Sequence, residues 1–190
     1  MTTRLARITP DEMTPEQHEI YAAFTDGRRA APGAAFSLVH PDGGLIGPPN
    51  AWLLSPALAR GLESFGGALR FDMSLSARSR EIAILLMAFH RESPFELYAH
   101  RKAGRAAGLS DAEIEGLATC TPPEFTTDEE RAVFTAALAL LDRKNLDDHE
   151  FAAATAVLGE RGVLELVVLL GWYDSVATQL AVFGVVPPED

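Results

Sequence analysis

The sequence contains a single cysteine, Cys120, among its 190 residues. One cysteine excludes an internal disulfide, a Cys-x-x-Cys redox pair and a cysteine-rich structural zinc site. Long apolar runs are also missing: the longest, at residues 82–89, is far too short to cross a bilayer. The N-terminus lacks the apolar stretch of a signal peptide. We therefore expect a cytoplasmic protein that does not enter a membrane.

Basic residues are few. The chain carries 16 Lys and Arg against 27 Asp and Glu, for a formal net charge of −11. An acidic chain repels phosphate backbones, and no basic stripe interrupts the pattern, so nucleic-acid binding is not expected. The motifs HExxH, GxSxG, GxGxxG and the P-loop are absent as well. No specific metal signature is found among the histidines and carboxylates.

No stretch alternates apolar and polar residues with period two, so no strands are predicted. Helix starts recur instead, as in Thr14-Pro15-Glu16-Gln17, and capping-box patterns begin at Ser93, Ser110 and Thr127. The sequence thus predicts an all-α fold of about eight helices. Their expected ranges are 15–25, 56–70, 77–91, 94–107, 111–117, 128–144, 148–159 and 161–183.

The chain is long and apolar enough, with 47% hydrophobic residues, to form one domain over residues 1–190. The helix at 15–25 precedes a Gly- and Pro-rich stretch at about 30–50, which we expect to be a loop. A loop of this length is either functional or a plain linker.

Two predicted helices are apolar on nearly every face, at residues 81–89 and 163–173. Such a helix is either central in the fold or covered by a partner subunit. The two segments also align, from Glu81 to His90 against Glu165 to Asp174, which suggests an internal helical repeat.

Three side chains are candidates for acid–base chemistry. Glu81 begins an apolar helix, where partial desolvation would raise its pKa; alternatively it complements the helix dipole beside Arg78 or Arg80. Glu96 and His100 are spaced i, i+4 on one helix face, and a carboxylate beside a histidine fixes its tautomer. Glu96 could equally cap its helix, and His100 could be a packing residue.

The stretches SREIAILLMAFHRESPFELYAH, with AGLS after it, and GPPNAWLLSPALARGLESFGGALRF resemble the carboxymuconolactone decarboxylase and AhpD-like alkylhydroperoxidase superfamily. The resemblance covers about residues 45–183. It gives Glu81 and His100 the positions of the family's proton relay. In the peroxidase branch a Cys-x-x-Cys pair lies between them, and those positions are Ser93 and Glu96 here. Without thiolates, peroxide reduction by a dithiol cycle is not expected.

The resemblance implies an AhpD-like helical bundle and a homo-oligomer (dimer, trimer or hexamer). It also implies a cofactor-free lyase or isomerase that acts on a small carboxylate or lactone, as in 4-carboxymuconolactone decarboxylase, with no metal or organic cofactor. The alternative is a non-catalytic binding or assembly protein with the same fold. The expected catalytic residues are His100, Glu81 and Glu96. The expected substrate-binding residues are Ser93, His90, Asn50, Trp52 and Tyr98, for which core packing or loop capping is the alternative role.

Overall fold

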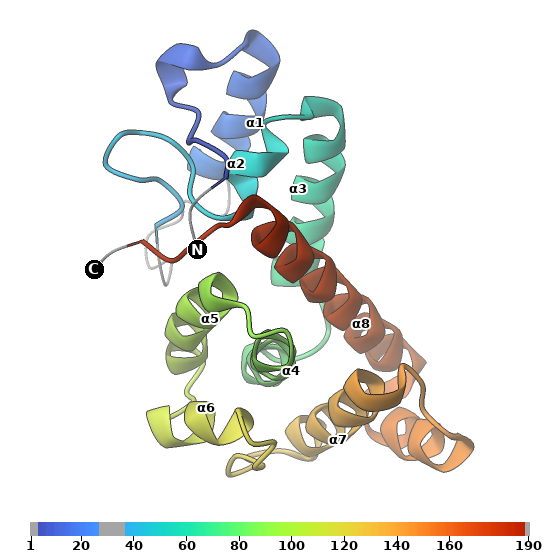
Figure 1. Ribbon diagram of the computed structural model, residues 1–190. Helices are drawn as coiled ribbons and strands as arrows, with labels where there is room; N and C mark the ends of the chain where they lie inside the picture. Colours follow the sequence, from blue (N-terminus) through green and yellow to red (C-terminus); the bar gives the residue numbers. More distant parts are fainter. Residues whose placement is uncertain (1–3, 27–36, 189–190) are drawn as a thin grey trace.

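The computed structural model describes residues 4–26 and 37–188, and this part of the chain is all-α (Figure 1). Its helices are α1 (Pro15–Thr25), α2 (Pro48–Trp52), α3 (Pro56–Phe71), α4 (Ala77–His90), α5 (Pro94–Ala106), α6 (Asp111–Leu117), α7 (Asp128–Arg143) and α8 (Asp148–Phe183), preceded by the 3₁₀ turn η1 (Pro10–Glu12). The predicted all-α class is confirmed. None of the described helices is long and apolar enough to cross a membrane.

Local signals set most helix ends. Reciprocal capping boxes form at Thr14, Ser110 and Asp147, where each N-cap side chain and the third helical side chain bond to the opposite backbone N–H. At Thr127 only half of the pattern forms. The two helices predicted at 148–159 and 161–183 are the two parts of α8, which is kinked at Gly159 (φ 67°, ψ 169°). Glycine adopts this positive φ without a steric penalty.

The expected loop at about 30–50 is partly wrong. Residues 27–36 lie outside the described part of the chain. Residues 37–47 form a turn with one antiparallel bridge between Val39 and Leu45. The short helix α2 then begins at Pro48, because proline at the first helical position needs no hydrogen-bond partner for its nitrogen.

Helix α4 lies at the centre of the larger part of the molecule, which we call the helical body (α4–α8). Ile82 and Leu85 of α4 are fully buried, and helices α5, α6, α7 and α8 all pack on α4. Its nearly all-apolar surface is therefore covered within one chain. The second apolar helix differs, since Leu164 of α8 is 63% exposed.

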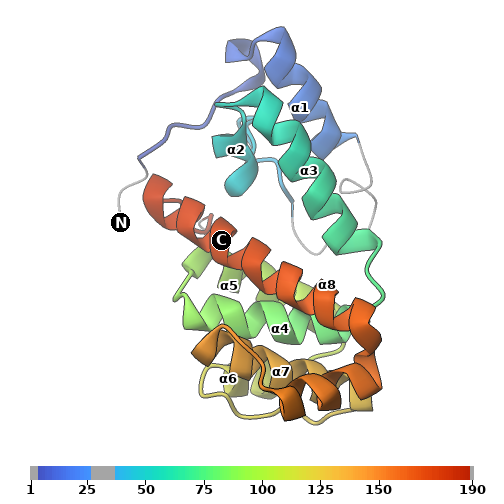
Figure 2. The same cartoon turned by 90° about the vertical axis from the view of Figure 1, so that its right-hand side faces the viewer.

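Helices α1–α3 and the segments between them form a second part, which we call the N-terminal layer (residues 4–26 and 37–71). Its small core includes Phe24, Leu45 and Trp52. Figure 2 shows α8 passing between this layer and helices α4–α7. Trp172 of α8 packs against the cores of both parts. The two parts therefore meet along α8.

Candidate active site

The turn from α4 to α5 carries Glu96 into the interior. Ser93 is the N-cap of α5, but it makes no side-chain capping bond, so the predicted capping box is wrong here. Phe95, the neighbour of Glu96, packs against Val176 and Leu180 of α8, which turns the start of α5 inward. Glu96 is only 2% exposed. Within the described residues, neither of its carboxyl oxygens has a hydrogen-bond partner, and neither does the Ser93 hydroxyl.

Burial decides the protonation of Glu96. Removal from water disfavours the charged carboxylate and raises its pKa from 4.5 to about 7. The positive charge of a protonated His100 opposes this rise only in part. Glu96 therefore changes charge near neutral pH, which is the property a proton carrier needs.

His100 lies one turn after Glu96 on α5 and is held by Glu81 of α4. The Nδ1 atom of His100 is 2.8 Å from Oε2 of Glu81. Both side chains are largely buried, and the Tyr173 ring stands edge-on to the imidazole, with centroids 4.9 Å apart. The contact with Glu81 orients the ring and leaves Nε2 as the other nitrogen for chemistry.

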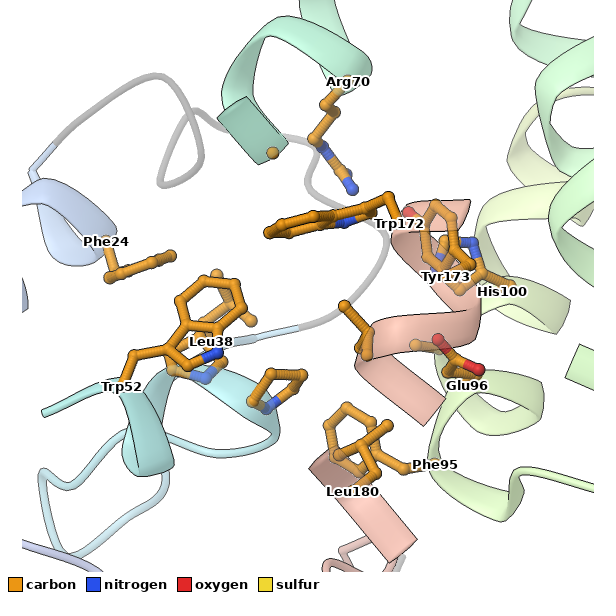
Figure 3. Close-up of a pocket in the computed structure, with 15 residues that line it drawn as sticks. Phe24, Leu38, Trp52, Arg70, Phe95, Glu96, His100, Trp172, Tyr173 and Leu180 are labelled. Atoms are coloured by element: carbon orange, nitrogen blue, oxygen red, sulfur yellow. The ribbon is translucent and has the colours of Figure 1, made fainter. Parts of the chain in front are cut away.

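Glu96 and His100 line a cavity of about 90 Å³ where the helical body meets the N-terminal layer (Figure 3). Its wall is mainly aromatic and apolar. The lining residues are Phe24, Leu38, Pro48, Pro49, Trp52, Gly66, Arg70, Phe95, Glu96, Ala99, His100, Trp172, Tyr173, Val176 and Leu180. We call this space the aromatic cavity.

A second cavity of about 320 Å³ lies beside Glu81. Glu81 and Arg80 line it, and Arg70 and Tyr173 line both cavities. The Glu81–His100 contact therefore joins the walls of two cavities, because His100 lines only the aromatic one.

Two of the predicted substrate-binding residues come from the N-terminal layer. Trp52 lines the aromatic cavity, and its Nε1–H donates to Oε1 of Gln179 on α8 at 2.7 Å. Asn50 does not line the cavity. Its side chain accepts a hydrogen bond from the Ile8 N–H and donates one to the Ala6 carbonyl, so it fixes the N-terminal segment.

The other predicted residues lie farther out. Tyr98 packs on Phe95, and its hydroxyl accepts a hydrogen bond from Lys102 at 2.8 Å. His90 is exposed at the C-terminus of α4 and lines neither cavity. Cys120 is free and exposed after α6. Among the described residues, no group of three or more His, Cys, Asp or Glu side chains could hold a metal ion.

Sequence reasoning missed Arg70, Trp172 and Tyr173 as cavity residues. Arg70 lies in the Leu-Arg-Phe element at the end of α3, which had been noted only as part of a family pattern. Trp172 and Tyr173 lie in the apolar segment of α8 and had been taken as core. Their place at the seam between two parts of the molecule carries no local sequence signal.

Comparison with known proteins agrees with this architecture. The Carboxymuconolactone decarboxylase family model matches residues 56–139. No curated protein matches the sequence. Three solved structures share the fold. A protein of unknown function from Agrobacterium tumefaciens, described in relation to the antioxidant defence protein AhpD, is 18% identical with a TM-score of 0.65, covering 74% of this chain and 97% of its own.

An uncharacterised peroxidase-related protein from Ralstonia eutropha, with an alkylhydroperoxidase AhpD core, is 13% identical (TM-score 0.76, 98% of this chain, 92% of its own). The debrominase Bmp8, in complex with 2,3,4-tribromopyrrole, is 12% identical (TM-score 0.70, 97% and 91%). The fold is thus the all-α AhpD-like fold. Residues 56–139 are in addition similar to the Carboxymuconolactone decarboxylase family.

Proposed function

We propose that this protein is a cofactor-free lyase or isomerase that transfers a proton to or from carbon in a small carboxylate or lactone substrate. One observation carries the proposal. The carboxyl group of Glu96 is buried without a partner, in a cavity that it shares with a histidine held by a second carboxylate. Perturbed carboxyl groups beside an oriented histidine are typical of acid–base sites.

In the lyase form, the bond from carbon to the leaving carboxylate breaks, and its electron pair moves into the conjugated carbonyl of the substrate to give an enolate. Protonated Glu96 or the imidazolium of His100 then delivers a proton to carbon. In the isomerase form, the same groups remove a proton from one carbon and return it to another. The apolar walls keep water from the enolate.

Glu81 has a different role in this scheme. It holds Nδ1 of His100 and stabilises the imidazolium, while its own carboxylate borders the second cavity. His100 therefore keeps its Nδ1–H on Glu81 and both gives up and regains the catalytic proton at Nε2.

The comparisons support an enzyme-like role of the kind found in this superfamily. The decarboxylase-like branch is the better candidate because Ser93 and Glu96 occupy the positions where the family resemblance expects the redox cysteines. Cys120 lines neither cavity and cannot replace that pair. That Bmp8 holds a small halogenated ring supports a small cyclic ligand here as well. The expected homo-oligomer and cytoplasmic location stay predictions.

The test follows proton exchange between substrate carbon and solvent deuterium by NMR, over a panel of unsaturated lactone acids. Wild type should exchange a carbon-bound proton or release CO₂ from at least one of them. His100→Asn and Glu96→Gln should slow this by about 100-fold or more. The control, His90→Asn, removes an exposed imidazole from the preceding helix and should leave the rate unchanged.

Full turnover by His100→Asn would remove the proposed relay. A wild-type protein that binds members of the panel but neither exchanges a proton nor releases CO₂ would instead favour the non-catalytic binding protein.

A further inference from the structure

One arginine, Arg70 at the end of α3, is among the residues that line the aromatic cavity. Figure 3 shows the Arg70 side chain extending from α3 toward Trp172. Its guanidinium lies 5.8 Å from the centroid of the Phe71 ring. Between residues 4–26 and 37–188, no carboxylate or carbonyl forms an ion pair or hydrogen bond with Arg70. Arginine stays charged at every physiological pH and binds carboxylates with a planar pair of donors. Within the described residues, Arg70 is therefore a charge without a counter-ion at the wall of the aromatic cavity.

Buried polar groups that lack a hydrogen-bond partner lie at the start of α5. The carboxyl group of Glu96 and the hydroxyl of Ser93 are buried without partners in the described structure. Buried polar groups without partners are rare, and each destabilises the folded protein. A ligand that presents a hydroxyl or N–H group to Glu96 would satisfy it. A ligand that fits this cavity would therefore place an anionic group at Arg70 and a hydrogen-bond donor at Glu96.

The walls between these two groups limit the shape of the ligand. Trp52 and Trp172 lie with ring centroids 5.8 Å apart and planes at 59°, and Phe24 packs 5.7 Å from Trp52. Aromatic walls favour flat, unsaturated ligands. The volume of about 90 Å³ is smaller than the cavity of about 150 Å³ that encloses benzene in another protein, but the aromatic cavity is open on one side, so a ligand of one ring would extend in part through this opening.

We propose that the aromatic cavity binds a single-ring, singly charged hydroxy or N–H acid, with its carboxylate on Arg70 and its donor on Glu96. This proposal deepens the proposed function, since it names the substrate class of the same site. It assigns Arg70 as the anion anchor and Glu96 as the acceptor for the donor, and both assignments concern binding before any chemical step.

Ligand binding can be followed by intrinsic tryptophan fluorescence, because both tryptophans of the sequence line this cavity. Titration with 3- and 4-hydroxybenzoate should quench tryptophan fluorescence, and calorimetry should give the same affinity. Benzoate lacks the donor and phenol lacks the anion. At least one hydroxybenzoate should bind about tenfold or more tightly than either, since each lost hydrogen bond to a charged group weakens binding by at least that factor.

Substitutions test which residue binds the carboxylate of the ligand and which binds its hydrogen-bond donor. Arg70→Met should abolish the higher affinity for hydroxybenzoate than for phenol. Arg70→Lys should keep part of this difference in affinity because the charge remains. Glu96→Leu should abolish the preference over benzoate only. The matched control is Arg60→Met, which removes an exposed arginine from the same helix and should change no affinity.

Equal affinity for phenol and the hydroxybenzoates, no binding of either hydroxybenzoate, or unchanged affinity in a folded Arg70→Met variant would each overturn the proposal. His100→Asn separates it from the proposed function. This variant should bind the hydroxybenzoates normally while losing proton exchange on its substrate. Binding by wild type without any turnover would refute the enzyme and keep the ligand class.

Discussion

The helical body and the N-terminal layer are built in different ways. The body has a continuous core around α4 and a buried charge network at its start. There Arg78 lies 2.6 Å from Glu113 and 3.3 Å from Glu130. The N-terminal layer has a small core, and its ion pairs, such as Arg60 with Glu19, lie at the surface. The helical body therefore has the larger core and the buried ion pairs, and the N-terminal layer packs on it with a smaller core.

This difference has a counterpart in the site. The ionisable side chains Arg70, Glu81, Glu96 and His100 all lie within residues 56–139, the span that matches the family model. Most of the aromatic walls come from outside that span, as with Trp52 in the layer and Trp172 on α8, whereas Phe95 lies inside it. The chemistry thus belongs to the part shared with the family, whereas the shape of the cavity comes from the parts around it.

The largest loss in the free energy of unfolding should come from a substitution in the helical body. Arg78→Met leaves Glu130, which is 2% exposed, without its cation, and should lower the free energy of unfolding by about 3 to 5 kcal/mol. Urea denaturation followed by circular dichroism measures it. Arg60→Met is the matched change in the layer and should lower the same free energy by less than about 1 kcal/mol, because its ion pair is exposed. Equal losses would contradict the contrast between the two parts.

The pH dependence of the free energy of unfolding tests the burial of Glu96 where the two parts meet. Its folded pKa of about 7 is above the ordinary 4.5, so between these values the folded protein binds more protons than the unfolded one. Stability should therefore fall as the pH rises through this window, by about 3 kcal/mol in total. Glu96→Gln has no proton to lose. Its stability relative to wild type should rise by that amount between about pH 4 and about pH 8, as measured by urea denaturation.

The control for this measurement is Glu124→Gln, which changes an exposed glutamate outside both cavities. A pH-independent difference between Glu96→Gln and wild type would show that Glu96 is solvated in solution and would weaken the proposed acid–base role.

The smallest effect should come from the contact between α2 and α5. Gly47 has φ 72° and ψ −152°, and a Cβ atom there would lie 2.5 Å from the Phe95 ring. Gly47→Ala should lower the free energy of unfolding by about 2 kcal/mol, from backbone strain and displacement of Phe95. Tryptophan fluorescence during urea denaturation reports it, because Trp52 and Trp172 both lie at this seam.

Gly61→Ala is the matched control within the layer, since nothing lies within 4 Å of the added Cβ atom in α3. It should leave stability unchanged or raise it by up to about 1 kcal/mol, because alanine favours a helix over glycine. A loss as large as that of Gly47→Ala would mean that the layer tolerates no added methyl group, whatever its surroundings.

Much of the fold could be predicted because its signals are local. The capping residues Thr14, Ser110 and Asp147 satisfy backbone groups of their own helices, and the apolar stretch from Ile82 required burial wherever it lay. Helix α2 was missed because a helix of five residues that begins with two prolines gives no periodic pattern. The internal repeat between the two apolar segments stays a prediction.

The candidate site was only partly accessible from sequence. Spacing placed Glu96 and His100 on one face. The apolar helix that Glu81 begins made it a candidate, and the family resemblance gave it the position of a relay residue. The capping pattern at Ser93 suggested that Glu96 caps its helix, and that was wrong, because packing of Phe95 on α8 outweighed a single capping bond. Asn50 and Tyr98 were expected near the substrate, but their hydrogen bonds lead to Ile8 and Lys102 instead.

The sequence by itself determined most of the helices and their order, because propensity, capping and apolar periodicity act over a few residues. Only the tertiary structure decided which side of α5 was covered, and with it the burial and raised pKa of Glu96. It also brought together Arg70, Trp52 and Trp172 from three separate helices. Burial and distance are properties of the packed molecule, and no local pattern in the chain encodes them.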